Sequence, residues 1–146
     1  MKLKNSKVII LDSWPVIGWF RGEKPAAEAM ENLLKKAEVG QVKVVFNLIN
    51  WGEVIYQILR EFDEKTLMEI VARFERLPIE LEPVDEELVI AAARWKVGGG
   101  LSYADCFAVA TAQKLGGAIL TGDPEFKSVE KEISITWIGE NRIKPF

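Results

Sequence analysis

The 146-residue sequence contains no histidine and only one cysteine, Cys106. Without histidine the chain lacks the usual general base of hydrolytic enzymes and every form of Ser-His-Asp triad. A single cysteine forms no disulfide within the chain, and without histidine it supplies neither a zinc finger nor a Cys/His nucleophile. We therefore expect Cys106 to be a small buried core residue.

Long apolar runs are also absent. No stretch approaches the roughly 18 apolar residues that indicate a membrane-spanning helix. The first residues, MKLK, lead directly into an expected strand and lack the pattern of a secretory signal peptide. These observations predict a cytoplasmic protein without membrane segments. The length and the 49% hydrophobic content predict one compact domain over residues 1–146.

The sequence has no excess of basic residues, since 19 Lys and Arg stand against 22 Asp and Glu, for a net charge of −3. Nucleic-acid-binding domains usually have a basic face, so this balance first argues against such a partner. Four of the acids, Asp12, Glu53, Asp105 and Asp123, are expected at one site. Without these four, the net charge of the remaining residues changes from −3 to +1. A metal ion bound there would cancel their charge. The acidic balance therefore does not exclude a phosphate-containing substrate.

Apolar runs alternate with segments of helical period, which favours an α/β fold with a mostly parallel sheet. Pro78 is expected to end a helix, and the three glycines at 98–100 indicate a turn within the domain. The expected strands are residues 8–11, 42–46, 79–81, 118–121 and 134–138, and the expected helices are residues 25–38, 50–61, 64–77, 85–95 and 102–115, of which 50–61 and 64–77 form a helical hairpin.

Four carboxylates occupy special positions in this layout. Asp12 and Asp123 each follow an apolar run that is expected to be a strand, while Glu53 and Asp105 fall in the opening turns of expected helices. The ends of parallel strands share one edge of a sheet, and ligands bind outside that edge. Four acids gathered there would repel one another unless cations lay between them. The pattern predicts a site for Mg²⁺ or Mn²⁺, which prefer carboxylate ligands.

Each of these acids also has an explanation without chemistry. Asn50 to Glu53 and Ser102 to Asp105 both have the spacing of a helix N-cap with an acid at the third helical position. The other two acids precede a serine and a proline and suit a cap or a turn. Capping alone does not explain why all four acids fall at the same edge of the expected sheet.

The order of the motifs around these acids resembles the PIN domain, and in particular the small VapC-type ribonuclease toxins of toxin–antitoxin pairs. The resemblance covers nearly the whole chain, and it is most specific in the last two motifs. It implies a five-stranded sheet flanked by helices in three layers, Mg²⁺- or Mn²⁺-dependent endoribonuclease activity, homodimerisation and inhibition by a VapB-like antitoxin. The motifs are LDS at 11–13, EV at 53–54, LSYAD at 101–105 and TGDPEF at 121–126.

The resemblance also assigns site residues. The family's acidic catalytic and metal-binding positions correspond to Asp12, Glu53, Asp105 and Asp123. We expect Asp12 and Asp105 to bind metal directly, and the other two to act through water or to orient the attacking water. Supporting positions correspond to Ser13, Thr121 and Glu125.

The sequence departs from the family pattern at three positions. Trp14 stands where similar proteins commonly carry Asn, which argues against a polar contact from this position. Asn47 and Asn50 replace the Ser or Thr often found ahead of the glutamate. Asn50 is expected to keep the capping role of the residue it replaces.

The mechanism that this site predicts needs no histidine, because a carboxylate-held metal ion activates water for attack on an RNA phosphodiester. Basic side chains are the expected phosphate contacts. Tryptophans beside apolar runs are more often core or interface residues than base-stacking residues. The RNA-binding candidates are Arg21, Lys24, Arg94 and Lys96.

Three other classes of protein share parts of this pattern. A haloacid-dehalogenase-like phosphohydrolase needs a second aspartate two residues after the first, where Trp14 stands. A phospho-acceptor receiver domain needs an acidic pair near the first strand, which residues 8–11 lack. A non-cutting PIN-like module that binds RNA or a partner remains open, although four filled acidic positions favour cleavage. The sequence leaves open the RNA target and its cleavage motif, one metal ion or two, the antitoxin's identity, and a toxin or RNA-processing role.

Overall fold

The structure, a computed structural model, describes residues 7–139. In this part of the chain five strands form one sheet in the order β3-β2-β1-β4-β5, and every neighbouring pair is parallel. The strands are β1 (Lys7–Leu11), β2 (Val42–Asn47), β3 (Ile79–Glu82), β4 (Ala118–Thr121) and β5 (Ile135–Trp137). The helices are α1 (Ser13–Phe20), α2 (Lys24–Glu38), α3 (Leu48–Glu61), α4 (Glu64–Phe74), α5 (Glu86–Val97), α6 (Tyr103–Leu115) and the 3-10 helix η1 (Pro124–Val129).

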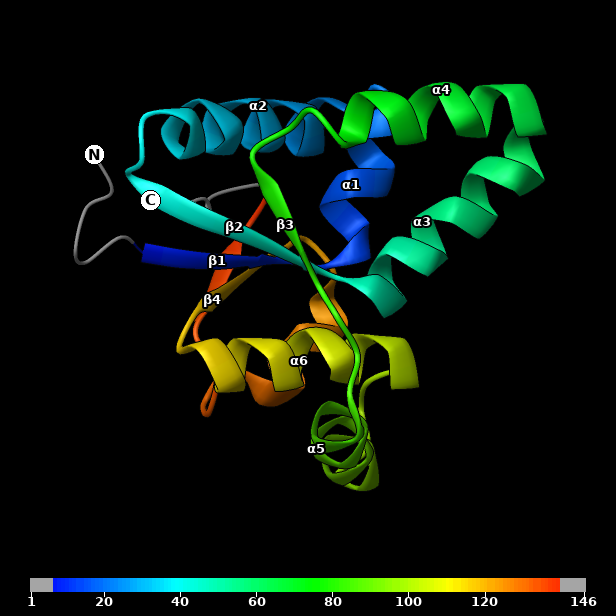
Figure 1. Cartoon of the computed structure of the whole chain (residues 1–146). Coiled ribbons are helices and arrows are strands. Elements are labelled where there is room, and N and C mark those ends of the chain that lie inside the picture. Colours follow the sequence, from blue (N-terminus) through cyan, green and yellow to red (C-terminus); the bar gives the residue numbers. More distant parts are fainter. Residues whose placement is uncertain (1–6, 140–146) are drawn as a thin grey trace.

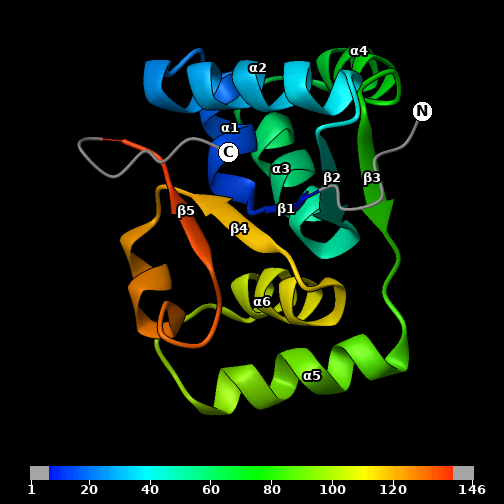
Figure 2. The same ribbon diagram turned by 90° about the vertical axis from the view of Figure 1, so that its left-hand side faces the viewer.

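Helices cover both faces of the sheet. Helices α1 to α4 lie on one face, and α5 and α6 lie on the other (Figures 1 and 2). This arrangement confirms the predicted three-layer α/β fold, with a sheet that is parallel throughout rather than mostly so. The prediction of one domain over residues 1–146 includes residues 1–6 and 140–146, which lie outside the described part of the chain.

The apolar runs of the strands serve two cores. In β1, Ile9 and Leu11 pack with the helices of one face, whereas Ile10 packs with the other face. Successive side chains of a strand point to opposite faces, so a strand buried on both sides reads as a continuous apolar run. Cys106 of α6 is fully buried in the second core, as predicted.

Helix α1 was not predicted from the sequence, because its composition shows no helical pattern. Pro15 lies near its first residue, where proline is tolerated, and the helix is too short and too evenly apolar to show a helical period. Gly18 allows α1 to approach α2 closely, since a Cβ at Gly18 would lie 2.5 Å from the Cβ of Ala26. Helix η1 was also not predicted.

The start of α3 corrects the capping prediction. The helix begins at Leu48, and its cap is Asn47 rather than Asn50, because the side chain of Asn47 accepts a hydrogen bond of 2.7 Å from the N–H of Ile49. Asn47 ends β2 with extended backbone, which a cap requires, whereas Asn50 lies within the helix. The spacing to Glu53 had favoured Asn50, but the helix begins three residues earlier than predicted from that spacing.

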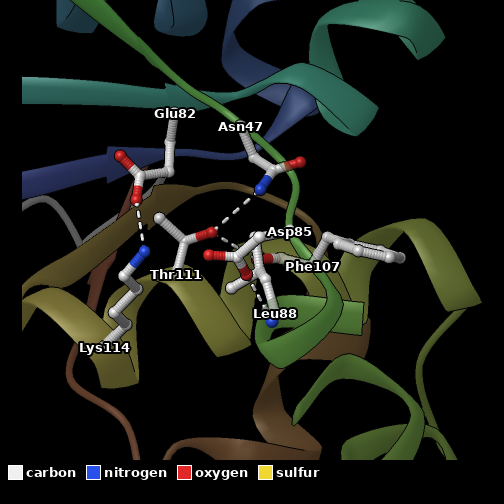
Figure 3. Close-up of polar contacts among 7 residues, drawn as sticks. All are labelled: Asn47, Glu82, Asp85, Leu88, Phe107, Thr111 and Lys114. Atoms are coloured by element: carbon white, nitrogen blue, oxygen red, sulfur yellow. Dashed lines mark hydrogen bonds and ion pairs between the residues drawn. The ribbon is translucent and has the colours of Figure 1, made fainter. Parts of the chain in front are cut away.

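Asn47 also joins β2 to the opposite layer. Its side-chain amide donates a hydrogen bond of 3.1 Å to the hydroxyl of Thr111 in α6, and that hydroxyl donates to the carbonyl of Phe107 (Figure 3). The same close-up shows Lys114 of α6 paired with Glu82 of β3 at 3.0 Å. Helix α6, which carries one of the predicted site acids, is therefore tied to two strands.

Among residues 7–139, none of the helices has the length and apolar character needed to cross a bilayer.

Candidate functional site

Three of the predicted acids meet at the carboxyl edge of the sheet. Asp12 follows β1 and caps α1, Asp123 follows the adjacent strand β4 and caps η1, and Asp105 lies in the first turn of α6. Each of the three offers a carboxylate oxygen, and these oxygens all lie within 4.8 Å of one another. Residues from distant parts of the chain thus form one acidic cluster.

Thr121, predicted as a supporting residue, links two of these acids. Its hydroxyl donates a hydrogen bond of 2.9 Å to Oδ2 of Asp12 and accepts one of 3.0 Å from the N–H of Asp123. The side chain is fully buried at the last position of β4. The hydroxyl therefore holds the ends of two neighbouring strands in one arrangement.

Glu53 borders the cluster without joining it. It lies on α3 and lines the same cavity, but the group of oxygens within 4.8 Å excludes it in the described part of the chain. The side-chain amide of Asn50 donates to Oε1 of Glu53 at 3.3 Å and to the carbonyl of Ala104 at 3.0 Å. One buried asparagine thus connects Glu53 to the residue that precedes Asp105.

Burial and mutual repulsion change the acidity of two carboxyls. Burial, followed by the charge of Asp105, raises the pKa of Asp12 well above its usual value, and the hydrogen bond from Thr121 only partly opposes this. Burial, opposed by a hydrogen bond with Ser102 and helped by the charges of Glu53 and Asp123, raises the pKa of Asp105 to about 6. When ionised, the carboxylates of the cluster therefore repel one another, and a bound positive charge would offset this repulsion.

The donor set fits a hard divalent cation. Oδ1 of Asp12 is buried and has no hydrogen-bond partner within the described residues, an arrangement that costs free energy unless another group satisfies the oxygen. Mg²⁺ and Mn²⁺ take carboxylate oxygens, and such an ion would satisfy this atom and offset the repulsion. The residues that would hold it are Asp12, Asp105 and Asp123.

The cluster opens into a cavity of about 470 Å³. The predicted supporting residues Ser13 and Glu125 line it, and the N–H of Glu125 donates to Oδ1 of Asp123 at 2.9 Å. Tyr56 and Gln57 also line it, although they were not predicted. They lie three and four residues after Glu53, on the same side of one helix, so helical spacing was an available signal.

The predicted RNA-binding residues fall in different places. Arg21 lines the acidic cavity, where Glu61 pairs with it at 2.7 Å. Lys24 and Arg94 are exposed and are not among the residues that line this cavity. Lys96 donates to the carbonyl of Leu101 at 2.8 Å, which stabilises the turn between α5 and α6.

Comparison with known proteins identifies the family. The family model of the PIN domain matches residues 9–132. The chain therefore belongs to the PIN domain family, as its motifs indicated, and the phosphohydrolase and receiver alternatives are set aside. No curated protein matches the chain.

Solved structures with the same fold include VapC-type toxins and their complexes. VapBC2 from Rickettsia felis, bound to a DNA fragment from its promoter, matches with a TM-score of 0.68 at 12% identity, over 90% of this chain and 99% of that chain. VapC20 of Mycobacterium tuberculosis, a Sarcin-Ricin loop cleaving toxin, matches with a TM-score of 0.66 at 17% identity, over 94% and 99%. VapBC from Salmonella typhimurium matches with a TM-score of 0.67 at 17% identity, over 90% and 97%.

The raised carboxyl pKa values predict how stability depends on pH. With Asp105 at about 6, the folded protein binds more protons than the unfolded chain above the ordinary aspartate pKa of about 3.9. The free energy of unfolding in EDTA should therefore fall as pH rises through this window, and the Asp105→Asn variant should show a shallower fall. Urea unfolding between about pH 4 and about pH 7 measures both slopes. Equal slopes would contradict the raised pKa of Asp105.

Asn50 is predicted to position the acids on either side of it. Asn50→Ala removes its hydrogen bonds to Glu53 and to Ala104, and loss of such a partner typically lowers metal affinity or activity by about 10- to 100-fold. Asn47→Ala is the matched control, because it removes a helix cap and the contact with Thr111 and should cost about 0.5–2 kcal/mol of stability while leaving Mn²⁺ affinity unchanged. Calorimetric titration with Mn²⁺ measures the affinity of both variants. Equal losses of affinity in Asn50→Ala and Asn47→Ala would refute the positioning role.

Proposed function

We propose that this protein is a metal-dependent endoribonuclease of the VapC type, acting as the toxin of a toxin–antitoxin pair. The observation that carries the proposal is the cluster of Asp12, Asp105 and Asp123, with a buried carboxylate oxygen that lacks a partner among the described residues. Membership in the PIN family and the fold shared with a Sarcin-Ricin loop cleaving toxin support it.

The acidic residues have distinct roles in this proposal. When bound, Mg²⁺ or Mn²⁺ supplies Lewis acidity and lowers the pKa of water in the site. Asp12, Asp105 and Asp123 hold the ion, and Thr121 keeps the Asp12 carboxylate in place through its hydrogen bond. Glu53, oriented by its hydrogen bond from Asn50, orients the attacking water and takes its proton.

The proposed reaction forms a bond between water oxygen and phosphorus and breaks the bond from phosphorus to the 3′ oxygen. The 3′ oxygen takes a proton from solvent, so the products have a 5′-phosphate and a 3′-hydroxyl. Arg21 lies in the same cavity and is the basic residue best placed to pair with a neighbouring phosphate. Lys24, Arg94 and Lys96 are weaker candidates, because they are absent from the lining of the cavity.

The experiment compares wild-type protein with Asp12→Asn on a pool of structured RNAs, with Mn²⁺ or with EDTA. Asparagine keeps the shape of Asp12 but loses the charge that would hold the ion, so cleavage by the variant should fall to the level seen in EDTA. Sequencing of the new RNA ends identifies 5′-phosphates at discrete sites. The matched control is Asp85→Asn, since Asp85 caps α5 through the N–H of Leu88 and asparagine caps equally well.

Discrete, Mn²⁺-dependent cuts by the wild type and by Asp85→Asn, absent with Asp12→Asn, would support the proposal. Equal cleavage by Asp12→Asn would refute it. Mn²⁺ binding without any cleavage of the pool would favour a PIN-like module that binds RNA or a partner without cutting.

We also propose a cytoplasmic homodimer that binds a VapB-like antitoxin, since similar structures are VapBC complexes. Helices α3 and α4 and the turn between them expose large apolar side chains, and burial of such a surface favours association. A dimer through α3 and α4 predicts a sedimentation mass of two chains at micromolar concentration, and a charge introduced by Phe62→Glu should shift it to one chain. A wild-type mass of one chain would contradict the dimer. The exposed side chains are Tyr56, Leu59, Phe62 and Met68.

A further inference from the structure

A second cavity adjoins the acidic cavity. It has a volume of about 460 Å³ and shares Trp14 and Pro25 with the acidic cavity. Its lining also includes Gly122 and Lys127, and no described lining residue is acidic. A cavity lined by acids and a cavity with a lysine and no described acid therefore share one indole ring, directly beside the proposed reaction centre.

The Trp14 indole is held in a defined place. Its backbone N–H donates to Oδ2 of Asp12 at 3.3 Å, which fixes the residue to a proposed metal ligand. Its six-membered ring lies over Gly122, the residue before Asp123, where a Cβ would come within 2.4 Å of the ring. The residue as a whole is nevertheless 36% exposed, and its side chain lines both cavities, so an aromatic surface stays available to a ligand.

Lys127 supplies a positive charge to the second cavity. The residue is exposed on η1, and within residues 7–139 its ammonium group makes no ion pair. Trp137 forms another wall, where its indole N–H donates to Glu130 at 3.1 Å. An aromatic surface beside a cation suits a flat, negatively charged ligand, and bases stack on aromatic side chains while lysine pairs with phosphate.

We propose that the second cavity is a nucleotide-binding subsite for one of the two nucleotides that flank the scissile phosphodiester. The base stacks on Trp14, and its phosphate pairs with Lys127. This inference rests on the proposed function, because continuity with the acidic cavity is what places the nucleotide next to the cut. Trp14 then contributes to the choice of cleavage site.

Two substitutions disturb the subsite in different ways. Trp14→Ala removes the ring, whereas Gly122→Ala keeps the ring but displaces it, since the new Cβ would overlap it. Loss of base stacking typically weakens binding by about 5- to 100-fold. Both variants should raise KM for RNA by that factor with a smaller change in kcat, and Trp14→Phe should restore most of the affinity. Gly52→Ala is the matched control, because no atom lies within 4 Å of a Cβ there.

The decisive readout is the base preference at the cut. A pool of random-sequence RNAs is cleaved by each protein, and the nucleotides on both sides of every cut are counted. Trp14→Ala and Gly122→Ala should flatten the preference at the same single flanking position, while Gly52→Ala keeps it. Replacing that nucleotide with an abasic one should slow the wild type and leave Trp14→Ala unaffected. Lys127→Gln should weaken RNA binding, and Lys65→Gln, with the same charge change, should not.

A second measurement does not depend on cleavage. The Asp12→Asn protein is titrated with short single-stranded RNAs that carry 2-aminopurine, whose fluorescence reports stacking. Quenching by Asp12→Asn that is lost in the double variant Asp12→Asn/Trp14→Ala supports the subsite. If the wild type cuts no RNA but this quenching is seen, only the proposed nuclease activity fails. Unchanged base preference together with unchanged quenching in both variants would overturn the subsite.

Discussion

Repulsion among buried carboxylates at one edge of the sheet is the constraint on which the site depends. Asp12 and Asp105 lie in the protein interior, and burial raises the pKa of each carboxyl. A sheet built only for stability would not gather such groups, because each buried charge without a partner costs free energy. The fold tolerates the cluster because parallel strand ends and helix starts supply N–H and hydroxyl donors there, and a divalent cation would offset the remaining cost.

Two residues around the cluster hold the acids in place from different sides. Thr121 joins two strand ends, and Asn50 joins α3 to the start of α6. The bond from Thr121 to Asp12 is buried and those of Asn50 are partly buried, and together they restrict the acids to one arrangement. The cavity therefore combines a preorganised acidic floor with a wall, at Trp14, that is apolar and partly exposed. In our proposals, the aspartates serve the chemistry and Trp14 serves the selection of the ligand.

Sequence reasoning succeeded where a local pattern has one structural meaning. Runs buried on both faces, such as β1, indicate strands of a parallel sheet, and their ends predict where a ligand lies. It failed where two residues fit one role or where the pattern is too short. Asn50 was predicted as the cap from its spacing to Glu53, but the backbone at the end of β2 makes Asn47 the cap. Helix α1 has too few turns to show a period.

The sequence by itself determined the fold class, the family and the three aspartates that approach one another, because apolar runs, helical periods and the place of each aspartate after a strand or at a helix start follow from the order of residues. Only the tertiary structure decided that Glu53 stands outside the group of three aspartates, that Arg21 alone of the basic candidates lines the cavity, and that Trp14 separates two cavities. Those facts depend on distances between segments far apart in the chain, which packing of the two cores sets and no local pattern contains.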